Sequence, residues 1–355
     1  MGVLVNWRSV FVWMLRLVAV CLMLPLLLSC SHQQDEVVSG KGAGKQLHVV
    51  SWNVQTFFDA QTSGLEYSEF RGSKSRWSRE LYEARLERLA EAIELLDADI
   101  LVLQEIENMA VMYDISNRLA GRLRGNDAYG WMSFHVEEGS AIGCGVFSRL
   151  PLGRKLVHQV DCRIRGEQPQ LRPLLEVEVL LGEGSGSDEA AAALTLFVCH
   201  WKSKSGGAEE AAFWQLQQEA LLELQLQRVL TSPTGTGRAL VCGDFNRELS
   251  EFSSVSSGGR QVFLGAVAAE NGWLHPNTTS SGSYWYQDDW ERIDHVFVAG
   301  RIQLLGFEAV DSGPWLFVIK SYIGSQIIFL TSTDCTFLIT CCINVTTVTQ
   351  PCCSV

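Results

Sequence analysis

Apolar and polar residues alternate along the chain in blocks that predict both strands and helices. Short, mostly apolar runs are typical of buried strands, and they cover residues 47–54, 99–108, 143–152, 173–181, 194–203, 238–246 and 292–298. Two longer stretches, 77–96 and 209–230, repeat apolar residues every three or four positions, the period of an amphipathic helix. Strands that alternate with helices predict an α/β or layered α+β domain.

One face of each predicted helix is apolar. The first helix has Tyr82, Leu86, Leu89, Ile93 and Leu96 on one face, and the second has Phe213, Leu216, Ala220 and Leu224.

Four of the apolar strands end in polar side chains. These are Asn53, Glu105, His200, and Asp244 with Asn246. Each one alone is a weak signal, because Asn and Gly-Asp pairs are common in ordinary turns. Buried strands open at one edge of a sheet, however, and sites assemble at such edges. The repeated ending therefore predicts that these side chains form one site.

Five motifs in a fixed order carry a resemblance to a known family. The motifs S-W-N-V, Q-E-I-E, H-W-K-S, G-D-F-N and R-I-D-H span roughly residues 47–310. This set resembles the endonuclease/exonuclease/phosphatase superfamily, the metal-dependent phosphoesterases related to deoxyribonuclease I. The stretch "HWKSKSGG" together with "GDFN" resembles a bacterial extracellular branch of it. The resemblance implies an α/β (α+β) domain over residues 46–313, built as a four-layer sandwich of two packed mixed β-sheets flanked by helices.

The resemblance also implies a metal site. Glu105 would be the principal ligand of Mg²⁺ (or Mn²⁺), with Asn53 close to it. Mg²⁺ prefers oxygen ligands and keeps several of its waters, so one or two carboxylates are sufficient to bind it. A hard cation suits phosphodiester cleavage, because negative charge grows on the phosphoryl and leaving oxygens.

Three further residues take catalytic roles by the same resemblance. Asp244 would align or deprotonate the attacking water, and Asn246 would donate a hydrogen bond to the phosphate as its charge grows. His200 would contact the phosphate or act as an acid toward the leaving group.

The stretch "ERIDHVFVAG" holds Asp294 and His295 side by side. Side chains alternate across a strand, so the two cannot both point into one site. The resemblance implies that Asp294 orients a catalytic histidine, which leaves His295 as a packed strand residue. In the family that histidine lies further on, in a Ser-Asp-His motif on the last strand, and this chain has no histidine after His295.

The C-terminal segment, residues 314–355, is unlike the rest of the chain. It contains only two charged residues, Lys320 and Asp334, and shows no clear helix or strand period. Our hypothesis is a shift of reading frame near residues 313–316, so that this tail replaces the last strand and its histidine. The alternative is a natural, divergent C-terminus. Loss of a general acid or base typically lowers a rate by about 10²–10⁴-fold.

The N-terminus predicts export. Residues 1–29 have arginines before an apolar run, which is typical of a signal peptide, and the run ends in "LLSC". This resembles a bacterial lipobox, so Cys30 is the predicted lipidation site and residues 30–45 a flexible tether. Leu28 fits that motif loosely, and an ordinary signal peptide is the alternative. We expect a membrane-anchored lipoprotein in the periplasm or on the cell surface, and a monomer.

The net charge of −12 provides no general attraction to nucleic acid, so contacts with phosphates must be local. Lys202 and Arg76 are the candidate substrate-binding residues, and scattered solvated charges are an equal alternative. The leading hypothesis is an exported, metal-dependent phosphoesterase, a nuclease that acts on DNA or RNA. The alternatives are a sphingomyelinase-like phospholipid phosphodiesterase and a non-catalytic surface lipoprotein.

Overall fold

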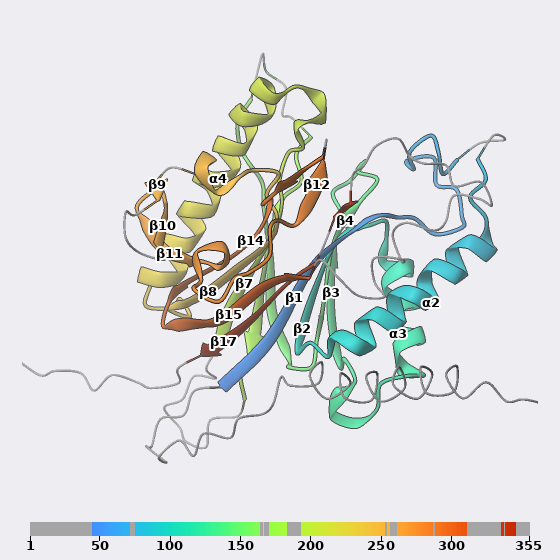
Figure 1. Ribbon diagram of the computed structural model, residues 1–355, viewed down its shortest axis with the longest axis horizontal. Helices are drawn as coiled ribbons and strands as arrows, with labels where there is room; N and C mark the ends of the chain where they lie inside the picture. The colour runs from blue at the N-terminus through green and yellow to red at the C-terminus, as the bar shows by residue number, and fades with distance from the viewer. Residues whose placement is uncertain are drawn as a thin grey trace, which may run out of the picture. The chain divides into compact units, whose positions relative to one another are not determined.

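Two β-sheets pack face to face in the computed structural model, and helices cover their outer faces (Figure 1). The structure describes residues 45–71, 75–163, 166, 170–182, 193–252, 254–255, 261–286, 288–310, 335–336 and 338–345. The helices are α2 (Arg79–Leu96), α3 (Met109–Ala120) and α4 (Ala208–Thr231). The strands are β1 (Lys45–Phe57), β2 (Ile100–Ile106), β3 (Trp131–His135), β4 (Gly143–Ser148), β5 (Leu152–His158), β6 (Leu174–Leu180), β7 (Ala193–His200), β8 (Arg238–Asp244), β9 (Ser254–Val255), β10 (Gln261–Leu264), β11 (Val267–Asn271), β12 (Tyr284–Tyr286), β13 (Asp289–Glu291), β14 (Asp294–Gly300), β15 (Ile302–Val310), β16 (Cys335–Thr336) and β17 (Leu338–Val345).

Both large sheets mix parallel and antiparallel pairs. The first sheet has six strands in the order β15-β17-β1-β2-β4-β3, and the second has eight in the order β5-β6-β7-β8-β14-β11-β10-β9. The parallel pairs are β1–β2 in the first sheet and β7–β8 in the second. A small third sheet contains β13, β12 and β16.

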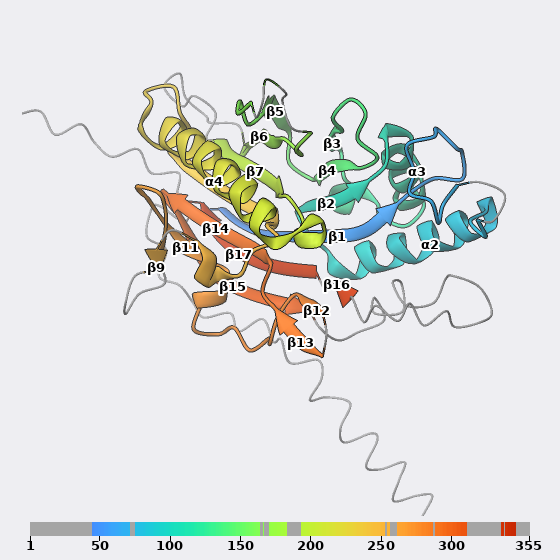
Figure 2. The same cartoon turned by 90° about the horizontal axis from the view of Figure 1, so that it is seen from above.

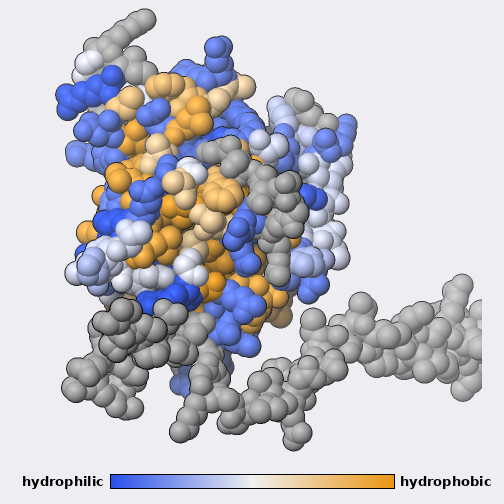
Figure 3. All heavy atoms as spheres, turned by 90° about the vertical axis from the view of Figure 1, so that its left-hand side faces the viewer, coloured by the Kyte–Doolittle hydropathy of each residue, from blue (hydrophilic) through white to orange (hydrophobic). Residues whose placement is uncertain are grey.

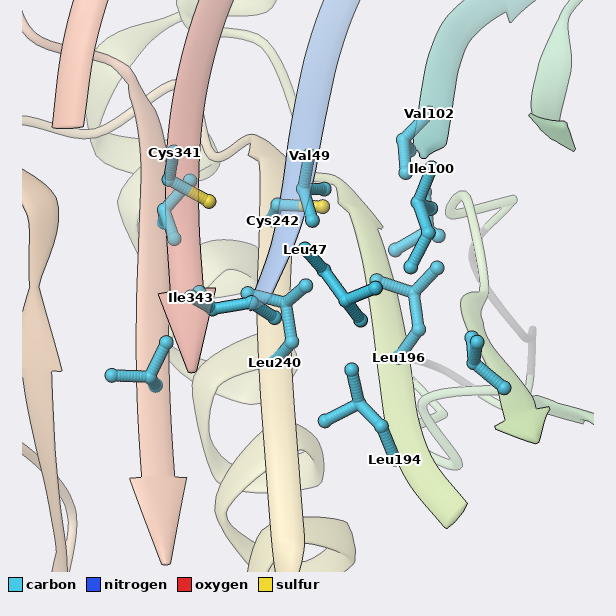
Figure 4. Packing of buried hydrophobic residues seen from close by; sticks show 14 of the residues in the cluster. Leu47, Val49, Ile100, Val102, Leu194, Leu196, Leu240, Cys242, Cys341 and Ile343 are labelled. Atoms are coloured by element: carbon cyan, nitrogen blue, oxygen red, sulfur yellow. The ribbon is translucent and has the colours of Figure 1, made fainter. Parts of the chain in front are cut away.

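The space between the two sheets is an apolar core. It is filled by every second residue of the strands, such as Leu47 and Val49 of β1 and Leu240 and Cys242 of β8 (Figure 4). The alternate residues of the same strands point outward, as side chains alternate along a strand.

Two outer cores complete the layers. The outward residues of the six-stranded sheet pack under α2 and α3, and those of the eight-stranded sheet pack under α4 (Figure 2). The predicted four-layer sandwich is therefore confirmed. Helix α4 packs through Leu222, Leu226 and Val229. Its predicted apolar face, with Phe213, Leu216 and Leu224, is instead exposed. The side of the molecule on which α4 lies in Figure 1 faces the viewer in Figure 3, where apolar patches lie among polar residues.

The tail contributes a strand, which the sequence did not predict. Strand β17 lies between β1 and β15 and pairs antiparallel with both. Its residues Ile339, Cys341 and Ile343 are buried in the core between the sheets. The expectation of a tail without a strand pattern is wrong for residues 338–345. Their alternate residues are apolar and face the core, and their backbone forms hydrogen bonds with β1 on one side and β15 on the other.

The segments assigned to export lie outside the described residues. These are the signal peptide (1–29) and Cys30 with the tether as far as residue 44, whereas Lys45 already belongs to β1. Among the helices of the described residues, none combines the length and the apolar character that a membrane crossing needs.

Candidate active site

Polar side chains replace apolar ones at one end of the core between the sheets. Asn53, His200, Asp244 and Asp294 continue the inward-facing alternation of β1, β7, β8 and β14, respectively. In the eight-stranded sheet, His200 pairs with Asp244 across β7 and β8, and Asp244 pairs with Asp294 across β8 and β14. Three of the predicted site residues thus lie in one row, and all four are at most 4% exposed.

Glu105 joins this group through a break in its strand. Strict alternation would send its side chain outward, because Ile100, Val102 and Gln104 occupy the inward positions of β2. Instead Glu105 has φ 65°, and the pairing of β2 shifts register between Gln104 and Ile106. A left-handed conformation is unfavourable for a residue with a Cβ, and such strain concentrates at functional sites.

Three more residues near the site share this backbone state. Gln55, Thr56 and Asn246 have φ of 54°, 48° and 50°. Together with Glu105 they are four of the six non-glycine residues with positive φ in the described part of the chain. The strained backbone is therefore concentrated around the polar cluster.

Asn53 links the two central carboxylates. Its Nδ2 donates to Glu105 Oε1 at 3.0 Å and to Asp244 Oδ2 at 3.0 Å. Backbone amides complete the arrangement, since Thr56 N donates to Glu105 Oε2 at 2.6 Å and Asn246 N donates to Asp244 Oδ1 at 2.8 Å. One oxygen of each carboxylate is thus held 3.0 Å from the same amide nitrogen.

Arg85 of α2 supports the turn that holds Glu105. Its guanidinium donates to three consecutive carbonyls, those of Val54 (2.8 Å), Gln55 and Thr56 (3.1 Å). It also lies over the ring of Phe57, 4.7 Å from the centroid. Burial lowers the pKa of Arg85 to about 10, which leaves it charged at neutral pH.

His200 faces both carboxylates as a neutral imidazole. Its Nε2 is 3.7 Å from Glu105 Oε1 and 3.8 Å from Asp244 Oδ2. Burial, with a smaller contribution from the Arg172 charge, lowers the pKa of His200 well below its ordinary value. Its Nδ1 has no hydrogen-bond partner among the described residues.

The surroundings of Asp244 and Asp294 disfavour the charged forms of both carboxylates. Burial raises the pKa of Asp244 to about 6, although hydrogen bonds from Asn246 and Asn53 favour its charged form. Burial and the Asp244 charge raise the pKa of Asp294 well above its ordinary value. Asp294 Oδ2 has no hydrogen-bond partner among the described residues.

A hard divalent cation fits this donor set. It would relieve the repulsion between the carboxylates, and their oxygens are ligands that Mg²⁺ prefers. Within the described part of the chain, no cluster of three or more Asp, Glu, His or Cys side chains forms a metal cage. A cation held by two carboxylates that keeps its own waters remains compatible with this site.

The side chains of the other predicted residues lie outside this network, although the Asn246 backbone amide belongs to it. The Asn246 side chain donates to Trp201 O at 3.2 Å. The backbone of Lys202 is fixed by Gln218 and Gln215 of α4, and Arg76 is exposed on the segment before α2. Among the described residues, neither Lys202 nor Arg76 forms an ion pair or a side-chain hydrogen bond with these carboxylates.

Sequence reasoning missed the cation that does lie at the site. Arg172 donates to Trp201 O at 3.0 Å, and its charge acts on both His200 and Asp244. It also forms a hydrogen bond with Tyr67, whose pKa is raised by burial and by the Glu105 charge. No local sequence signal marks Arg172. It lies just before β6, and only the antiparallel pairing of β6 with β7 brings it beside the end of β7, where His200 sits.

His295 lies on the opposite face from Asp294, as predicted. Its ring packs among Phe245, Phe252 and Phe297, and its Nε2 donates to Arg247 O at 2.8 Å. Burial lowers the pKa of His295 to about 4, so it is neutral in the folded protein at neutral pH. It is a core residue.

The fold and the site together define a phosphoester hydrolase of the deoxyribonuclease I-like class. Residues 50–329 match a family model described as the Endonuclease/Exonuclease/phosphatase family. The chain belongs to that family, so the predicted family and class of enzyme are confirmed. The matched region extends beyond residue 313, where we predicted that the domain ends.

Solved structures show the same fold. An endonuclease/exonuclease/phosphatase family protein from Bacteroides thetaiotaomicron has a TM-score of 0.53 at 13% identity, covering 86% of this chain and 97% of that one. TDP2 from C. elegans has a TM-score of 0.52 at 14% identity, covering 87% and 78%. D. rerio TDP2 complexed with single strand DNA product has a TM-score of 0.52 at 16% identity, covering 85% and 100%. Comparison with the sequences of curated proteins gave no significant match.

Proposed function

We propose that this chain is an exported, metal-dependent phosphodiesterase that cleaves nucleic acid. The observation that carries the proposal is the Asn53 amide, which bridges the Glu105 and Asp244 carboxylates with neutral His200 beside them. Phosphodiester cleavage needs a cation, a group that activates water and donors toward the phosphate, and this cluster provides a residue for each.

Glu105, with Asn53 beside it, would hold the metal. A bound Mg²⁺ or Mn²⁺ supplies charge stabilisation for the phosphoryl group. Thr56 N and Asn53 Nδ2 fix the two oxygens of Glu105, which keeps the carboxylate oriented before any ligand binds. Such preorganisation lowers the cost of binding a cation that demands a defined geometry.

Asp244 would accept the proton of the attacking water. A pKa of about 6 places it close to neutral pH, where a general base is most effective. His200 would donate a hydrogen bond to the phosphate, since a buried neutral imidazole cannot act as a charged acid. Of the two roles that the resemblance left open for His200, we therefore favour contact with the phosphate.

Asn246 would have to use its second amide hydrogen to donate to a phosphate. One of its amide hydrogens is taken by Trp201 O, and an amide carries two. Arg172 is the better placed donor, because its charge already acts on His200 and Asp244. We assign it, ahead of Lys202 and Arg76, to contact with the substrate phosphate.

Asp294 is the orienting carboxylate that lacks its histidine. Among the described residues its Oδ2 has no hydrogen-bond partner, which fits a position that a histidine would occupy in the family. We expect the catalytic rate of this chain to be about 10²–10⁴-fold lower than that of an enzyme with that histidine. Resequencing the 3′ end of the gene tests whether a shifted reading frame explains the loss of this histidine. If no alternative frame encodes a Ser-Asp-His motif after Gly313, the frameshift hypothesis is wrong.

Nucleic acid is the substrate we favour. TDP2 of D. rerio, which shares the fold, is seen with a single strand DNA product. Arg172 provides a local positive charge at the site, although the chain as a whole has a net charge of −12. With Cys30 lipidated, the enzyme would act outside the cytoplasm at the membrane surface.

Three substrates distinguish the possible functions. Purified protein with Mg²⁺ should nick plasmid DNA or cleave RNA, and EDTA should abolish the activity. Glu105→Ala should lose it, whereas Glu209→Ala, an exposed carboxylate on α4, should keep it. Release of phosphocholine from sphingomyelin would instead identify a lipid phosphodiesterase. No hydrolysis of any of these, with metal binding absent, would contradict the proposal and leave a binding role.

A further inference from the structure

Helix α4 buries two glutamines in its first half. Further along the helix, Leu222, Leu226 and Val229 pack on the eight-stranded sheet. In the first half, however, Gln215 is only 1% exposed and Gln218 only 5%. Burying an amide side chain is costly unless its donor and its acceptor are both hydrogen-bonded. The partners of the two glutamines therefore indicate which part of the molecule they stabilise.

The partners are backbone groups of three loops at the site. Gln218 Oε1 accepts from Lys202 N at 2.9 Å, and Gln218 Nε2 donates to Arg172 O at 3.3 Å. Gln215 Nε2 donates to Lys202 O at 2.8 Å and to Asn246 O at 3.0 Å. Helix α4 thus holds the backbone of Lys202 through both its N–H and its carbonyl.

The peptide between Trp201 and Lys202 connects Gln218 to the site. Gln218 holds the N–H of this peptide, and the carbonyl accepts from Arg172 Nη1 at 3.0 Å and Asn246 Nδ2 at 3.2 Å. The peptide is trans, so its N–H and its carbonyl point in opposite directions. Because Gln218 fixes one side of the peptide, the carbonyl on the other side has a defined direction toward the two donors.

Arg172 is held at both ends by this arrangement. Its carbonyl accepts from Gln218, and its guanidinium donates to the Trp201 carbonyl. Pro173 follows Arg172 and restricts its backbone to extended conformations. A guanidinium carries five N–H groups, so the bonds to Trp201 O and to Tyr67 leave others for a phosphate.

We propose that Gln218 is a positioning residue that aims the Arg172 guanidinium at the substrate phosphate. The inference rests on the proposed function, in which Arg172 contacts that phosphate. The Gln218 side chain bonds backbone groups and acts through the Trp201–Lys202 peptide. Without the amide, this peptide loses the partner that fixes its direction, and Arg172 loses an acceptor in a defined place. Donors that are oriented in advance stabilise the charge that grows on a phosphoryl group without having to reorganise.

The test is a double-mutant cycle on cleavage of a 5′-labelled oligonucleotide by the full-length protein with Mg²⁺. Gln218→Met keeps the length of the side chain but lacks the amide, and it should lower kcat/KM by about 10- to 100-fold, as a small displacement of a substrate-contacting group does. In an Arg172→Ala background the same change should have little effect, because no guanidinium remains to be positioned. Gln217→Met, at a half-buried glutamine of the same helix, should match the wild type.

A purely structural role of Gln218 predicts a different result. Loss of stability alone would lower the activity by the same factor in both backgrounds, so equal losses with and without Arg172 would overturn the inference. An unchanged rate in Gln218→Met would overturn it as well. If Gln218→Met does not fold, Gln218→Glu takes its place in the cycle. This variant keeps the acceptor for Lys202 N and loses the donor to Arg172 O, and its smaller loss should depend on Arg172 in the same way.

A crystal structure of the variant used in the cycle separates this inference from the proposed function. We expect Arg172 Nη1 to lie beyond hydrogen-bond distance of Trp201 O. A contact that stays at 3.0 Å, as in the wild type, would contradict the inference whether or not the protein cleaves the oligonucleotide. Absence of cleavage by the wild type, together with a displaced Arg172 in the variant, would contradict only the proposed function.

Discussion

At the scale of single residues, Arg85 supports the backbone turn on which the proposed metal site depends. Its guanidinium donates hydrogen bonds to three carbonyls of the left-handed turn. The Thr56 amide of the same turn donates to Glu105 and fixes its orientation. Arg85→Met should therefore weaken Mn²⁺ binding by about 10- to 100-fold, as is typical for loss of a residue that supports a metal ligand. Isothermal titration of the full-length protein measures this change.

Two control variants separate an effect of Arg85 on metal affinity from an effect on overall stability. Arg85→Lys keeps a donor and should retain part of the affinity. Arg79→Met removes an exposed arginine from the same helix and should bind Mn²⁺ like the wild type. If Arg85→Met loses stability but keeps its Mn²⁺ affinity, Arg85 is structural only.

Asp294 gives the metal-free protein a stability that falls as pH rises. Its pKa is raised above the ordinary 3.8, so the fold favours the protonated carboxyl. Below the ordinary pKa of 3.8 both states hold the proton; as the pH rises above it the unfolded chain releases the proton first, and each unit of difference in pKa costs about 1.4 kcal/mol. Asp294→Asn should therefore become increasingly more stable than wild type as the pH rises from 4 toward neutral. Urea unfolding in EDTA measures this, and a gap that is independent of pH would contradict the assignment.

The residue types of the site could be predicted, but their geometry could not. Asn53, His200, Asp244 and Asp294 continue the inward alternation of their strands, so motif and period agree. Glu105 faces them through a left-handed backbone that no periodicity indicates. Arg172 was missed because its position depends on the pairing of β6 with β7, a contact between strands that no local pattern shows.

At the scale of elements, β17 makes the tail part of the fold. Ile343 is fully buried between the sheets, while the adjacent Cys342 is exposed. Ile343→Ala should cost about 2–5 kcal/mol of unfolding free energy, because it leaves a cavity in the core. Cys342→Ala should change it by no more than about 0.5 kcal/mol. Chemical unfolding compares the two, and equal small effects would show that β17 is not part of the folded protein.

Elements with a strong local period were predictable. Helix α2 buries Tyr82, Leu86, Leu89 and Ile93, which is the face that its spacing indicates. Strand β17 was not predicted, because its burial depends on pairing with β1 and β15, which lie far away in sequence. The face of α4 was assigned wrongly, since Gln215, Gln218 and Glu219 are buried there through hydrogen bonds and an ion pair that hydropathy does not record.

At the scale of the whole molecule, the lipid anchor at Cys30 stays a prediction. A lipidated protein should partition into the detergent phase of Triton X-114, because an acyl chain adds about 0.8 kcal/mol per buried CH₂. Cys30→Ser should move the protein to the aqueous phase. Partition of both forms into the aqueous phase would favour an ordinary signal peptide.

The expectation of a monomer is also a whole-molecule statement. Light scattering after size-exclusion chromatography of a form that begins after Cys30 measures the mass in solution. A mass of one chain is the expected result, and a dimer mass would contradict it.

The central claim is that the Glu105–Asn53–Asp244 cluster hydrolyses phosphodiesters with a divalent metal. The most direct measurement is the rate at which the full-length protein cleaves a 5′-labelled oligonucleotide as Mg²⁺ is titrated, for wild type and Glu105→Gln. We predict a rate that rises to saturation with Mg²⁺ and vanishes in EDTA, and a rate at least about 100-fold lower in Glu105→Gln at every Mg²⁺ concentration. Cleavage that persists in EDTA, or that is equal in the two proteins, would contradict the claim.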